Sequence, residues 1–371
     1  MGRGLNLSFL VLLIANFFFF LNFSQLMLLP KFIVHLGLGP ADIGLIMGMF
    51  SISVLIALPF VGTVSEKTDK KKVFIFGTLL MFGATPMYVY VQTLGAYILV
   101  LRVIQGVGFS CALGVTAAMV FEIVPDSSRR YLLGVLTVFN ISTHAIGPAF
   151  GEYIIRTAGF DMFFLTAGCF GFVAFFCGFF LPRVSICEEK KAFALSRAFP
   201  HITATAVLGI VFGSAVIFLP PYLMTTGIPD SSLFFVAFVC GSLVVWIFLY
   251  KVFHGIGERA AWIVSVILLL MLPSGVSGLN SLAMLVLLSG LFGVGYGYLY
   301  PTLNTLFIDD IYPGMRGLSS SLFVWSFNLG MLLASFGFGH MSGTFGYQLS
   351  FAITALAGIV LLLFTTRLIR N

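Results

Sequence analysis

The chain has 371 residues, of which 60% are hydrophobic and only 9% are charged, and its mean hydropathy is +1.10. So few polar side chains cannot cover a globular surface, which excludes a soluble domain and indicates a protein that crosses the membrane several times. The net charge of +6 does not point to nucleic acid as a partner, because the basic residues fall mostly in short loops between apolar stretches.

Apolar stretches of about 19 to 27 residues recur along the chain, each long enough to cross a hydrocarbon core of roughly 30 Å as a helix. They predict twelve membrane-spanning helices. The expected spans of the first half are residues 5–30, 42–64, 73–92, 96–121, 131–155 and 160–182. Those of the second half are residues 201–224, 231–252, 261–279, 281–307, 317–341 and 347–367. The first stretch is too long for a signal-peptide core, so we expect a permanent helix.

The positions of Lys and Arg set the predicted orientation. With the amino terminus in the cytoplasm, sixteen of the nineteen basic residues fall in cytoplasmic loops or tails, as the positive-inside rule requires. Only Lys31 and Arg156 then lie outside, and Arg102 lies in the membrane. We therefore expect both termini in the cytoplasm, and the short loops favour a bacterial inner (plasma) membrane. The five cysteines stand at no ligand spacing, so neither disulfides nor a metal are expected.

The longest polar interval lies at the midpoint and carries the sequence CEEKK, which predicts a linker. It separates six expected spans from six. We expect an N-terminal six-helix bundle over residues 1–184, a cytoplasmic linker over 185–200 and a C-terminal six-helix bundle over 201–371.

The two halves also match each other in sequence. The run Gly106–Gly108 in span four recurs as Gly293–Gly295 in span ten. In the same way, Phe139–Asn140 in span five recurs as Phe327–Asn328 in span eleven. These matches predict an internal repeat and define which positions of the two halves are equivalent.

An acidic residue followed seven places later by an arginine occurs in both halves, as Glu122 with Arg129 and as Asp309 with Arg316. Six spans separate the two copies, so both have the same direction in the membrane. This arrangement is typical of parallel repeats related by an axis along the membrane normal.

These motifs resemble the major facilitator superfamily, and the resemblance covers the whole chain. It is carried by GTVSEKTDKKK between spans two and three, RVIQGVG in span four, GPAFG in span five and the two acid-x6-Arg elements. GPAFG is similar to a signature of the twelve-helix drug/proton antiporter branch, although Thr143 and Glu152 replace two of its glycines. The resemblance implies an all-α integral membrane fold of two pseudo-symmetric six-helix bundles.

Arg102 and Gln105 share one face of span four, where a lipid-facing helix would carry neither. The resemblance implies that spans one, four, seven and ten line a central cavity. We expect Arg102 to be a fixed positive charge at the outer part of that cavity, oriented by Gln105. The other expected cavity residues are Asn22, Gln25, Tyr296, Tyr300 and Asn304. The alternatives are that Arg102 snorkels to the interface and that the amides join helices.

Charged residues gather at the expected cytoplasmic face. In the family, acids at the ends of spans four and ten pair with basic residues of neighbouring helices when this side is closed. The residues in those places are Glu66, Glu122, Arg129, Asp309 and Arg316. We expect them to form a cytoplasmic gate; the alternative is ordinary interfacial charges, because exposed pairs contribute only about 0 to 1 kcal/mol.

Uphill transport needs an energy source, and the sequence has no nucleotide-binding motif of the form G-x-x-x-x-G-K-[ST]. An ion gradient is the remaining option. His144 is the ionisable residue nearest a span centre, and the ordinary histidine pKa of about 6.5 suits proton coupling. Glu152 lies eight positions later, near the same face. We expect Arg102, His144 and Glu152 to couple transport to protons; the alternative for His144 is a buried structural histidine.

We therefore expect a monomeric secondary active transporter that moves a small organic solute by alternating access. The leading hypothesis is proton-coupled efflux of a drug or metabolite. Proton-coupled uptake of an organic anion or nutrient is the close alternative. A membrane receptor or structural protein is the alternative of another class. The spans show no nucleophile with a base and no metal-binding spacing, so we expect neither an enzyme nor a cofactor. The expected partners are the solute, protons and the lipid bilayer.

Overall fold

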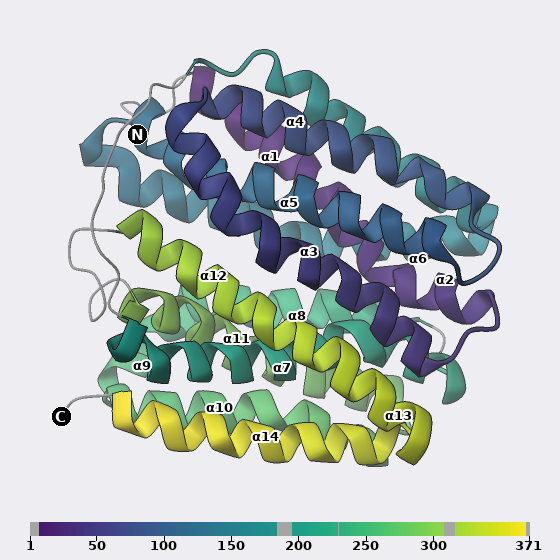
Figure 1. The fold of residues 1–371 in the computed structure, drawn as a ribbon. Coiled ribbons are helices and arrows are strands. Elements are labelled where there is room, and N and C mark those ends of the chain that lie inside the picture. Colours follow the sequence, from purple (N-terminus) through teal and green to yellow (C-terminus); the bar gives the residue numbers. More distant parts are fainter. Residues whose placement is uncertain (1–6, 184–194, 229, 308–315, 369–371) are drawn as a thin grey trace. The chain divides into compact units, whose positions relative to one another are not determined.

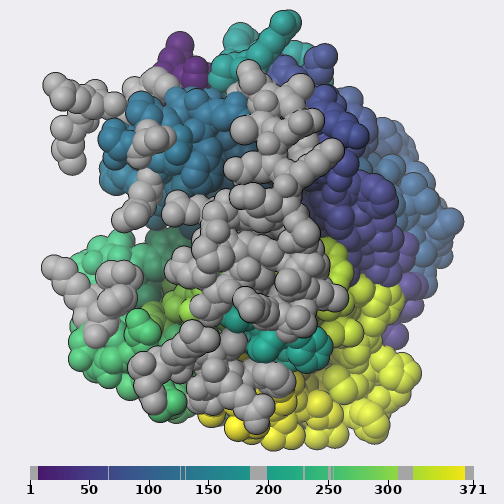
Figure 2. All heavy atoms as spheres, turned by 60° about the vertical axis from the view of Figure 1, so that its left-hand side comes forward, coloured from purple at the N-terminus to yellow at the C-terminus, as the bar shows by residue number. Residues whose placement is uncertain are grey.

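The computed structural model describes residues 7–183, 195–228, 230–307 and 316–368, and the remaining residues are drawn in grey in Figures 1 and 2. Throughout the described part the chain is almost entirely helical, as its composition predicts. The helices of the first half are α1 (Leu7–Gln25), η1 (Leu26–Leu28), α2 (Leu29–His35), α3 (Pro40–Lys67), α4 (Lys70–Ala84), η2 (Pro86–Tyr90), α5 (Ala96–Ile123) and α6 (Asp126–Gly178).

The second half follows the same plan. Its helices are α7 (Leu195–Thr225), α8 (Ser232–Val244), η3 (Val245–Leu249), α9 (Tyr250–Gly255), α10 (Glu258–Gly275), η4 (Val276–Gly278), α11 (Leu282–Leu306), α12 (Arg316–Leu333), η6 (Ala334–Phe338), α13 (Gly339–Phe345) and α14 (Tyr347–Leu368). The segments η3 and η6 are π-helical turns that continue the helices before them. Figure 1 shows α10 and α14 running side by side at one edge of this half.

Ten described segments are long and apolar enough to cross a membrane, and the shorter apolar helix Tyr347–Leu363 follows them. One of the ten, within α6, covers 52 residues, about twice the length that one crossing needs. Gly159 interrupts α6 with a φ of 81° and a ψ of −177°, a backbone conformation that glycine adopts without strain. With α6 counted as two crossings and Tyr347–Leu363 as one more, the described segments agree with the twelve predicted spans.

Two compact units make up the chain. The first comprises described residues within 1–29 and 49–191, and the second those within 30–48 and 192–371. Residues 30–48 thus belong with the second half. A Cβ atom at Gly44 would lie only 2.2 Å from the carbonyl oxygen of Ser335, so α3 approaches η6 at backbone distance there. The expected linker at 185–200 lies mostly outside the described residues, and the boundaries of the two bundles stay a prediction.

The repeated Gly-x-Gly of α5 and α11 has the same packing role in both units. A Cβ at Gly106 would lie 2.7 Å from the Phe50 carbonyl oxygen on α3, and one at Gly293 would lie 2.1 Å from the Phe238 carbonyl oxygen on α8. Phe50 and Phe238 themselves stand at equivalent positions of the two halves. Because only glycine permits such close contact, the repeat preserves a helix crossing.

The second glycine of each pair faces another helix. A Cβ at Gly108 would lie 2.7 Å from the Gly77 carbonyl oxygen on α4, and one at Gly295 would lie 2.5 Å from the Ser265 carbonyl oxygen on α10. Gly77 and Ser265 are again equivalent positions of the repeat. The two units are therefore built on one packing plan, which confirms the predicted pseudo-symmetry.

Candidate functional site

Arg102 is buried in the first unit, with only 3% of its surface exposed. Its Nη1 donates a hydrogen bond of 3.0 Å to Oε1 of Gln105, one turn later on α5. The guanidinium carbon also lies 4.8 Å from the centre of the Phe50 ring, within the range of a cation–π interaction. Burial of the whole side chain within the unit disfavours the snorkelling arrangement, since a snorkelling arginine keeps its charged head in water.

Gln105 connects Arg102 to a larger network. Its Oε1 also accepts a hydrogen bond of 3.0 Å from the Tyr88 hydroxyl, and its Nε2 donates to Oγ1 of Thr85 at 3.2 Å. Oγ1 of Thr85 also accepts from Nδ2 of Asn22 at 3.3 Å. The network thus joins α5, the turn η2 and α1. Tyr88 and Thr85 carry no sequence motif, so the sequence did not reveal them.

Asn22 and Gln25 join α1 to the second half of α6. Nδ2 of Asn22 donates to the carbonyl oxygen of Ala167 at 2.6 Å, and Nε2 of Gln25 donates to the carbonyl oxygen of Phe163 at 2.9 Å. Gln25 also donates to Oγ1 of Thr166 at 3.0 Å. Asn22 also belongs to the Arg102 network through Thr85, and the hydrogen bonds of both amides hold helices together.

The glycines of GPAFG allow α6 to approach α1. A Cβ at Gly147 would lie 2.8 Å from the backbone nitrogen of Gln25, and one at Gly151 would lie 2.8 Å from the Phe163 ring. In this chain, therefore, the motif sets the contact between the first half of α6, α1 and the second half of α6. Pro148 lies between the two glycines and continues the helix.

His144 lies in this contact, on the first half of α6. Its Nδ1 is 2.7 Å from Oγ of Ser24 on α1, and Oγ of Ser24 is 2.9 Å from Oγ1 of Thr143. Thr143 in turn donates to the carbonyl oxygen of Asn140 at 2.6 Å. One turn before His144, the side chains of Asn140 and Asn16 are hydrogen-bonded across the same two helices. The histidine is therefore held within a short row of polar contacts.

Glu152 lies two turns after His144 and is 4% exposed. Its Oε1 is 3.5 Å from Nε of Arg156, one turn later on the same helix. The arginine side chain is about half exposed, so the pair connects a buried carboxylate to the surface of the unit.

Tyr296 and Tyr300 belong to an aromatic cluster of the second unit. The Tyr296 ring stacks on Phe212 of α7 at 4.7 Å between ring centres and on Tyr300 at 5.1 Å. Tyr300 meets the rings of Phe323 and Phe327 on α12 edge-on. Both tyrosines keep part of their surface exposed. Tyr300 and Tyr296 therefore form a half-open aromatic surface on α11.

Asn304 lies one turn after Tyr300 on the same helix. Its Oδ1 is buried and accepts no hydrogen bond from any described residue. A buried carbonyl oxygen without a donor costs about 1–3 kcal/mol, so this atom favours a partner with an N–H or O–H group. The sequence predicted Tyr296, Tyr300 and Asn304 together because they follow one another at steps of four.

Each unit contains a triangle of aromatic rings at equivalent positions. In the first unit Phe23, Phe50 and Phe109 lie 4.6 to 5.7 Å apart between ring centres. In the second unit Phe212, Phe238 and Tyr296 lie 4.7 to 5.7 Å apart. In the internal repeat, Phe23 is equivalent to Phe212, Phe50 to Phe238 and Phe109 to Tyr296. Only the second triangle contains a hydroxyl group.

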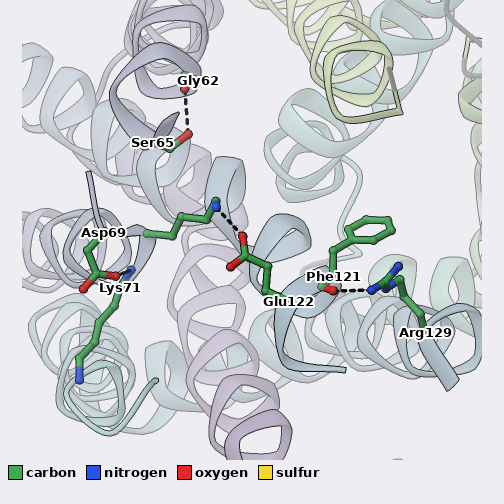
Figure 3. A network of polar contacts seen from close by, with 8 residues as sticks. Gly62, Ser65, Asp69, Lys71, Phe121, Glu122 and Arg129 are labelled. Carbon is green, nitrogen blue, oxygen red and sulfur yellow. Dashed lines mark hydrogen bonds and ion pairs between the residues drawn. The ribbon is translucent and has the colours of Figure 1, made fainter. Parts of the chain in front are cut away.

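The charged cluster expected at the cytoplasmic face is partly described. Glu122 at the end of α5 pairs with Lys70 at the start of α4, with 2.6 Å between Oε1 and Nζ. Figure 3 shows Glu122 turned toward α4, while Arg129 donates from Nη2 to the carbonyl oxygen of Phe121 at 2.6 Å. Arg129 also lies over the Phe121 ring. Lys70 was not among the predicted gate residues, although it stands in the GTVSEKTDKKK motif.

Asp69 of the same motif caps α4, because its carboxylate accepts from the backbone nitrogen of Lys71 at 3.0 Å (Figure 3). Of the remaining predicted gate residues, Asp309 and the side chains of Glu66 and Arg316 lie outside the described part of the chain. Among the described residues no group of three His, Cys, Asp or Glu side chains is placed to hold a metal.

Solved structures with the same fold cover nearly the whole chain. The crystal structure of the nucleoside transporter NupG superimposes with a TM-score of 0.79 at 13% identity, covering 99% of this chain and all of that one. The human organic anion transporter MFSD10 superimposes with a TM-score of 0.71 at 16% identity, over 96% and 98% of the two chains. Identities this low show a shared fold only.

Two sequence relatives add to this. The chain is 26% identical over 189 residues to the quinolone resistance protein NorA of Staphylococcus aureus, which is 51% of this chain and 47% of that protein. The match therefore spans about half the length of that relative. The chain is also 22% identical over 343 residues to the uncharacterized MFS-type transporter MJ1560 of Methanocaldococcus jannaschii, covering 88% of each.

The family model of the Major Facilitator Superfamily matches residues 11–323. That range contains the RVIQGVG and GPAFG motifs and most of the twelve spans. Together with the helical architecture and the repeated packing of the two units, this match shows that the chain is a multi-pass membrane protein that belongs to the Major Facilitator Superfamily of transporters.

Proposed function

We propose that this transporter exports a small amphipathic organic molecule with an aromatic ring, in exchange for protons, by alternating access between its two units. The observation that carries the proposal is the half-open aromatic surface of α11, formed by Tyr296 and Tyr300 with the buried acceptor of Asn304 beside it. These groups differ from the closed, hydrogen-bonded polar network around Arg102 in the first unit.

The chemistry of this surface defines the class of solute. Stacked aromatic rings favour another flat ring, with about 0.5–1.5 kcal/mol for each well-placed pair. The Asn304 oxygen favours a solute that carries an N–H or O–H donor. Helix α11 has no charged residue between Leu282 and Leu306, so this surface offers no ion pair to a strongly charged solute. A neutral or weakly charged aromatic amphiphile satisfies all three conditions.

His144 supports coupling to protons. It is the titratable side chain nearest the middle of its span in the first unit, and it lies among hydroxyl groups rather than against an opposite charge. The unperturbed pKa of histidine, about 6.5, lies closer to physiological pH than that of the other common proton-binding side chains. One proton moved across 100 mV contributes about 2.3 kcal/mol, enough for a concentration ratio of several tens. Arg102 and Glu152 remain further candidates for this coupling.

The cytoplasmic gate is part of the same proposal. The Lys70–Glu122 pair joins α4 to α5, and Arg129 fixes the turn after α5 through the Phe121 carbonyl group. Such partly exposed contacts are individually weak. Several of them together shift an equilibrium between states that differ by a few kcal/mol. The gate is proposed to be completed by Glu66, Asp309 and Arg316.

Export is favoured by the likeness to NorA, whose name records resistance to quinolones. GPAFG points the same way, since it resembles the signature of the drug/proton antiporter branch. We propose further that the protein acts as a monomer in the inner membrane with both termini in the cytoplasm, since this orientation places most of its basic residues on the cytoplasmic side.

The direct test is transport by purified protein in vesicles with an imposed pH gradient, using the fluorescent quinolone norfloxacin as the probe. We expect accumulation that depends on the gradient and that Tyr296→Ala weakens, whereas Tyr296→Phe keeps it. Empty vesicles and vesicles without a gradient are the controls. Equal distribution of norfloxacin and of a set of other aromatic amphiphiles, with or without the gradient, would contradict the proposal.

Proton-coupled uptake of an organic anion is the second candidate, and the positive charge of Arg102 favours it. The same vesicles separate the two, because an exporter exchanges solute for protons in opposite directions whereas a symporter moves both together. Reversing the sign of the pH gradient therefore reverses the expected direction of accumulation in each case.

A further inference from the structure

Three polar side chains meet where the first half of α6 crosses α1: Ser24, Thr143 and His144. The contacts are 2.9 Å between Oγ of Ser24 and Oγ1 of Thr143, and 2.7 Å between Oγ of Ser24 and Nδ1 of His144. Oγ1 of Thr143 also lies 2.6 Å from the carbonyl oxygen of Asn140 and 3.5 Å from Nδ1 of His144. These contacts determine which atoms carry hydrogens.

The carbonyl oxygen of Asn140 only accepts, so the single hydroxyl hydrogen of Thr143 must lie in that contact. Oγ1 of Thr143 is then an acceptor toward Ser24, and the single hydroxyl hydrogen of Ser24 must lie between the two hydroxyls. Oγ of Ser24 has no hydrogen left for the histidine. Nδ1 of His144 must therefore be the donor in its contact with Oγ of Ser24.

Any other assignment leaves two oxygen atoms in contact at 2.6 or 2.9 Å with no hydrogen between them, or Ser24 facing a nitrogen lone pair without a hydrogen. Water does not relieve this constraint, because Ser24 and Thr143 are fully buried. A neutral imidazole has one N–H group, and when Nδ1 carries it the lone pair lies on Nε2. The contacts thus select one tautomer.

We infer that Ser24 and Thr143 hold His144 as the Nδ1–H tautomer, so that Nε2 is the atom that binds and releases the transported proton. The proton comes from water on one side of the membrane, forms an N–H bond with the Nε2 lone pair, and leaves to water on the other side. Nδ1 keeps its hydrogen throughout. This inference rests on the proposed proton coupling, and it makes Ser24 and Thr143 positioning residues.

The charged and titratable groups around His144 are few. Helix α1 has none between Leu7 and Gln25, and its nearest ring to the imidazole is Phe23, at 6.4 Å between centres. On α6 itself the charged or titratable residues nearest in sequence after His144 are Glu152, Tyr153 and Arg156, two or three turns away. Helix α5 contributes Arg102, which lies over Phe50, and the thiol of Cys111. The hydroxyl contacts are therefore the direct determinants of the tautomer.

The second unit lacks this arrangement. With the two halves aligned on their aromatic triangles and on the repeated Phe-Asn pair, the positions equivalent to this trio are Gly213, Met331 and Leu332. They lie at a helix contact too, since a Cβ at Gly213 would lie 2.9 Å from Sδ of Met331. The helix crossing is shared by the units, whereas at these equivalent positions the first unit has a histidine with two hydroxyl residues and the second unit has neither.

The first experiment is nitrogen NMR of full-length protein labelled with 15N-histidine, in lipid nanodiscs. The chain has five histidines, and the signal of His144 is the one lost in His144→Gln. We expect a protonated Nδ1 and an unprotonated Nε2 at high pH, with Nε2 gaining the proton as the pH falls. Protonation at Nε2 and a free Nδ1 in the neutral state would overturn the inference.

The second experiment uses Ser24→Ala and Ser24→Thr. Loss of the hydroxyl leaves Nδ1 without its acceptor, so we expect the Nε2–H tautomer to appear and the pH profile of proton-driven norfloxacin transport to move, with up to about a tenfold lower rate near neutral pH. Ser24→Thr keeps the hydroxyl and is expected to restore both. An unchanged tautomer and pH profile in Ser24→Ala would overturn the inference.

The two experiments separate this inference from the proposed function. If the wild type shows the Nδ1–H tautomer but no transport driven by a pH gradient, the proposed coupling fails, and the proton role of Nε2 fails with it. If gradient-driven transport is present but His144 is protonated on Nε2 in its neutral form, the proposed function stands and the assigned tautomer is wrong.

Discussion

The two units share their packing and differ in their chemistry. Both have an aromatic triangle at equivalent positions and glycines at the same helix crossings. In the first unit, however, span four carries Arg102 and Gln105, where the equivalent residues of α11 are Ser289 and Phe292. Phe292 is fully buried among aromatic rings. The same helix packing thus supports a polar network and a histidine in the first unit and an aromatic surface in the second.

The proposed function assigns different roles to the two units. Helix crossings at backbone distance fix where the spans lie, whereas a few substituted positions give the two units different side-chain chemistry. We expect the first unit to bind and release protons and the second unit to bind the organic solute.

The largest expected effect concerns the shared packing. Gly293→Val places a Cβ 2.1 Å from the carbonyl oxygen of Phe238, so α8 and α11 must separate. Overpacking of this kind costs about 1–3 kcal/mol or more, and we expect a large fall in Tm or loss of folded protein. Gly290→Ala on the same helix is the control, since its nearest neighbour is an ordinary contact at 3.9 Å. Equal thermal stability of the two variants would show that the crossing is not close.

Arg102→Ser replaces the arginine by serine, the residue at the equivalent position 289 of the second unit. It removes the hydrogen bond to Gln105 and the contact with Phe50, so we expect a loss of about 1–2 kcal/mol in the free energy of unfolding. Thermal unfolding in detergent measures this, with Ser289→Ala as the matched control. If stability is unchanged while the KM for the solute rises, Arg102 contacts the solute rather than the network.

The aromatic surface is tested at equivalent positions of the two units. Tyr296→Ala removes a ring stacked on Phe212 and Tyr300, and we expect the KM for an aromatic solute to rise about tenfold. Phe109→Ala in the first triangle is expected to lower stability and leave the KM of the folded fraction near that of the wild type. Similar increases in KM for both variants would show that the two triangles share the role.

Charge reversal tests the smallest effect. Lys70→Glu and Glu122→Lys each break the pair at 2.6 Å, and we expect a change of up to about fivefold in transport rate, because a partly exposed pair contributes at most about 1 kcal/mol. The double reversal is expected to restore the rate. Rates that match the wild type in all three variants would exclude a gating role for the pair.

The spans, the internal repeat and the family follow from the sequence because hydropathy and glycine motifs are local signals. The turn between spans five and six fell at Gly159, between the predicted ends at 155 and 160. The hydrogen-bond partners of the polar residues could not be predicted from such local signals. Nothing in one sequence places Ser24 beside His144, Tyr88 beside Gln105 or Lys70 beside Glu122, since each contact depends on the height and rotation at which two distant helices cross.

The measurement that tests the proposed roles of the two units most directly compares His144→Gln with Tyr296→Ala in the same vesicles. Solute exchange without a gradient and accumulation driven by a pH gradient are both recorded. We predict that His144→Gln keeps exchange but loses accumulation, whereas Tyr296→Ala weakens both through a higher KM. Full gradient-driven accumulation by His144→Gln would contradict the account.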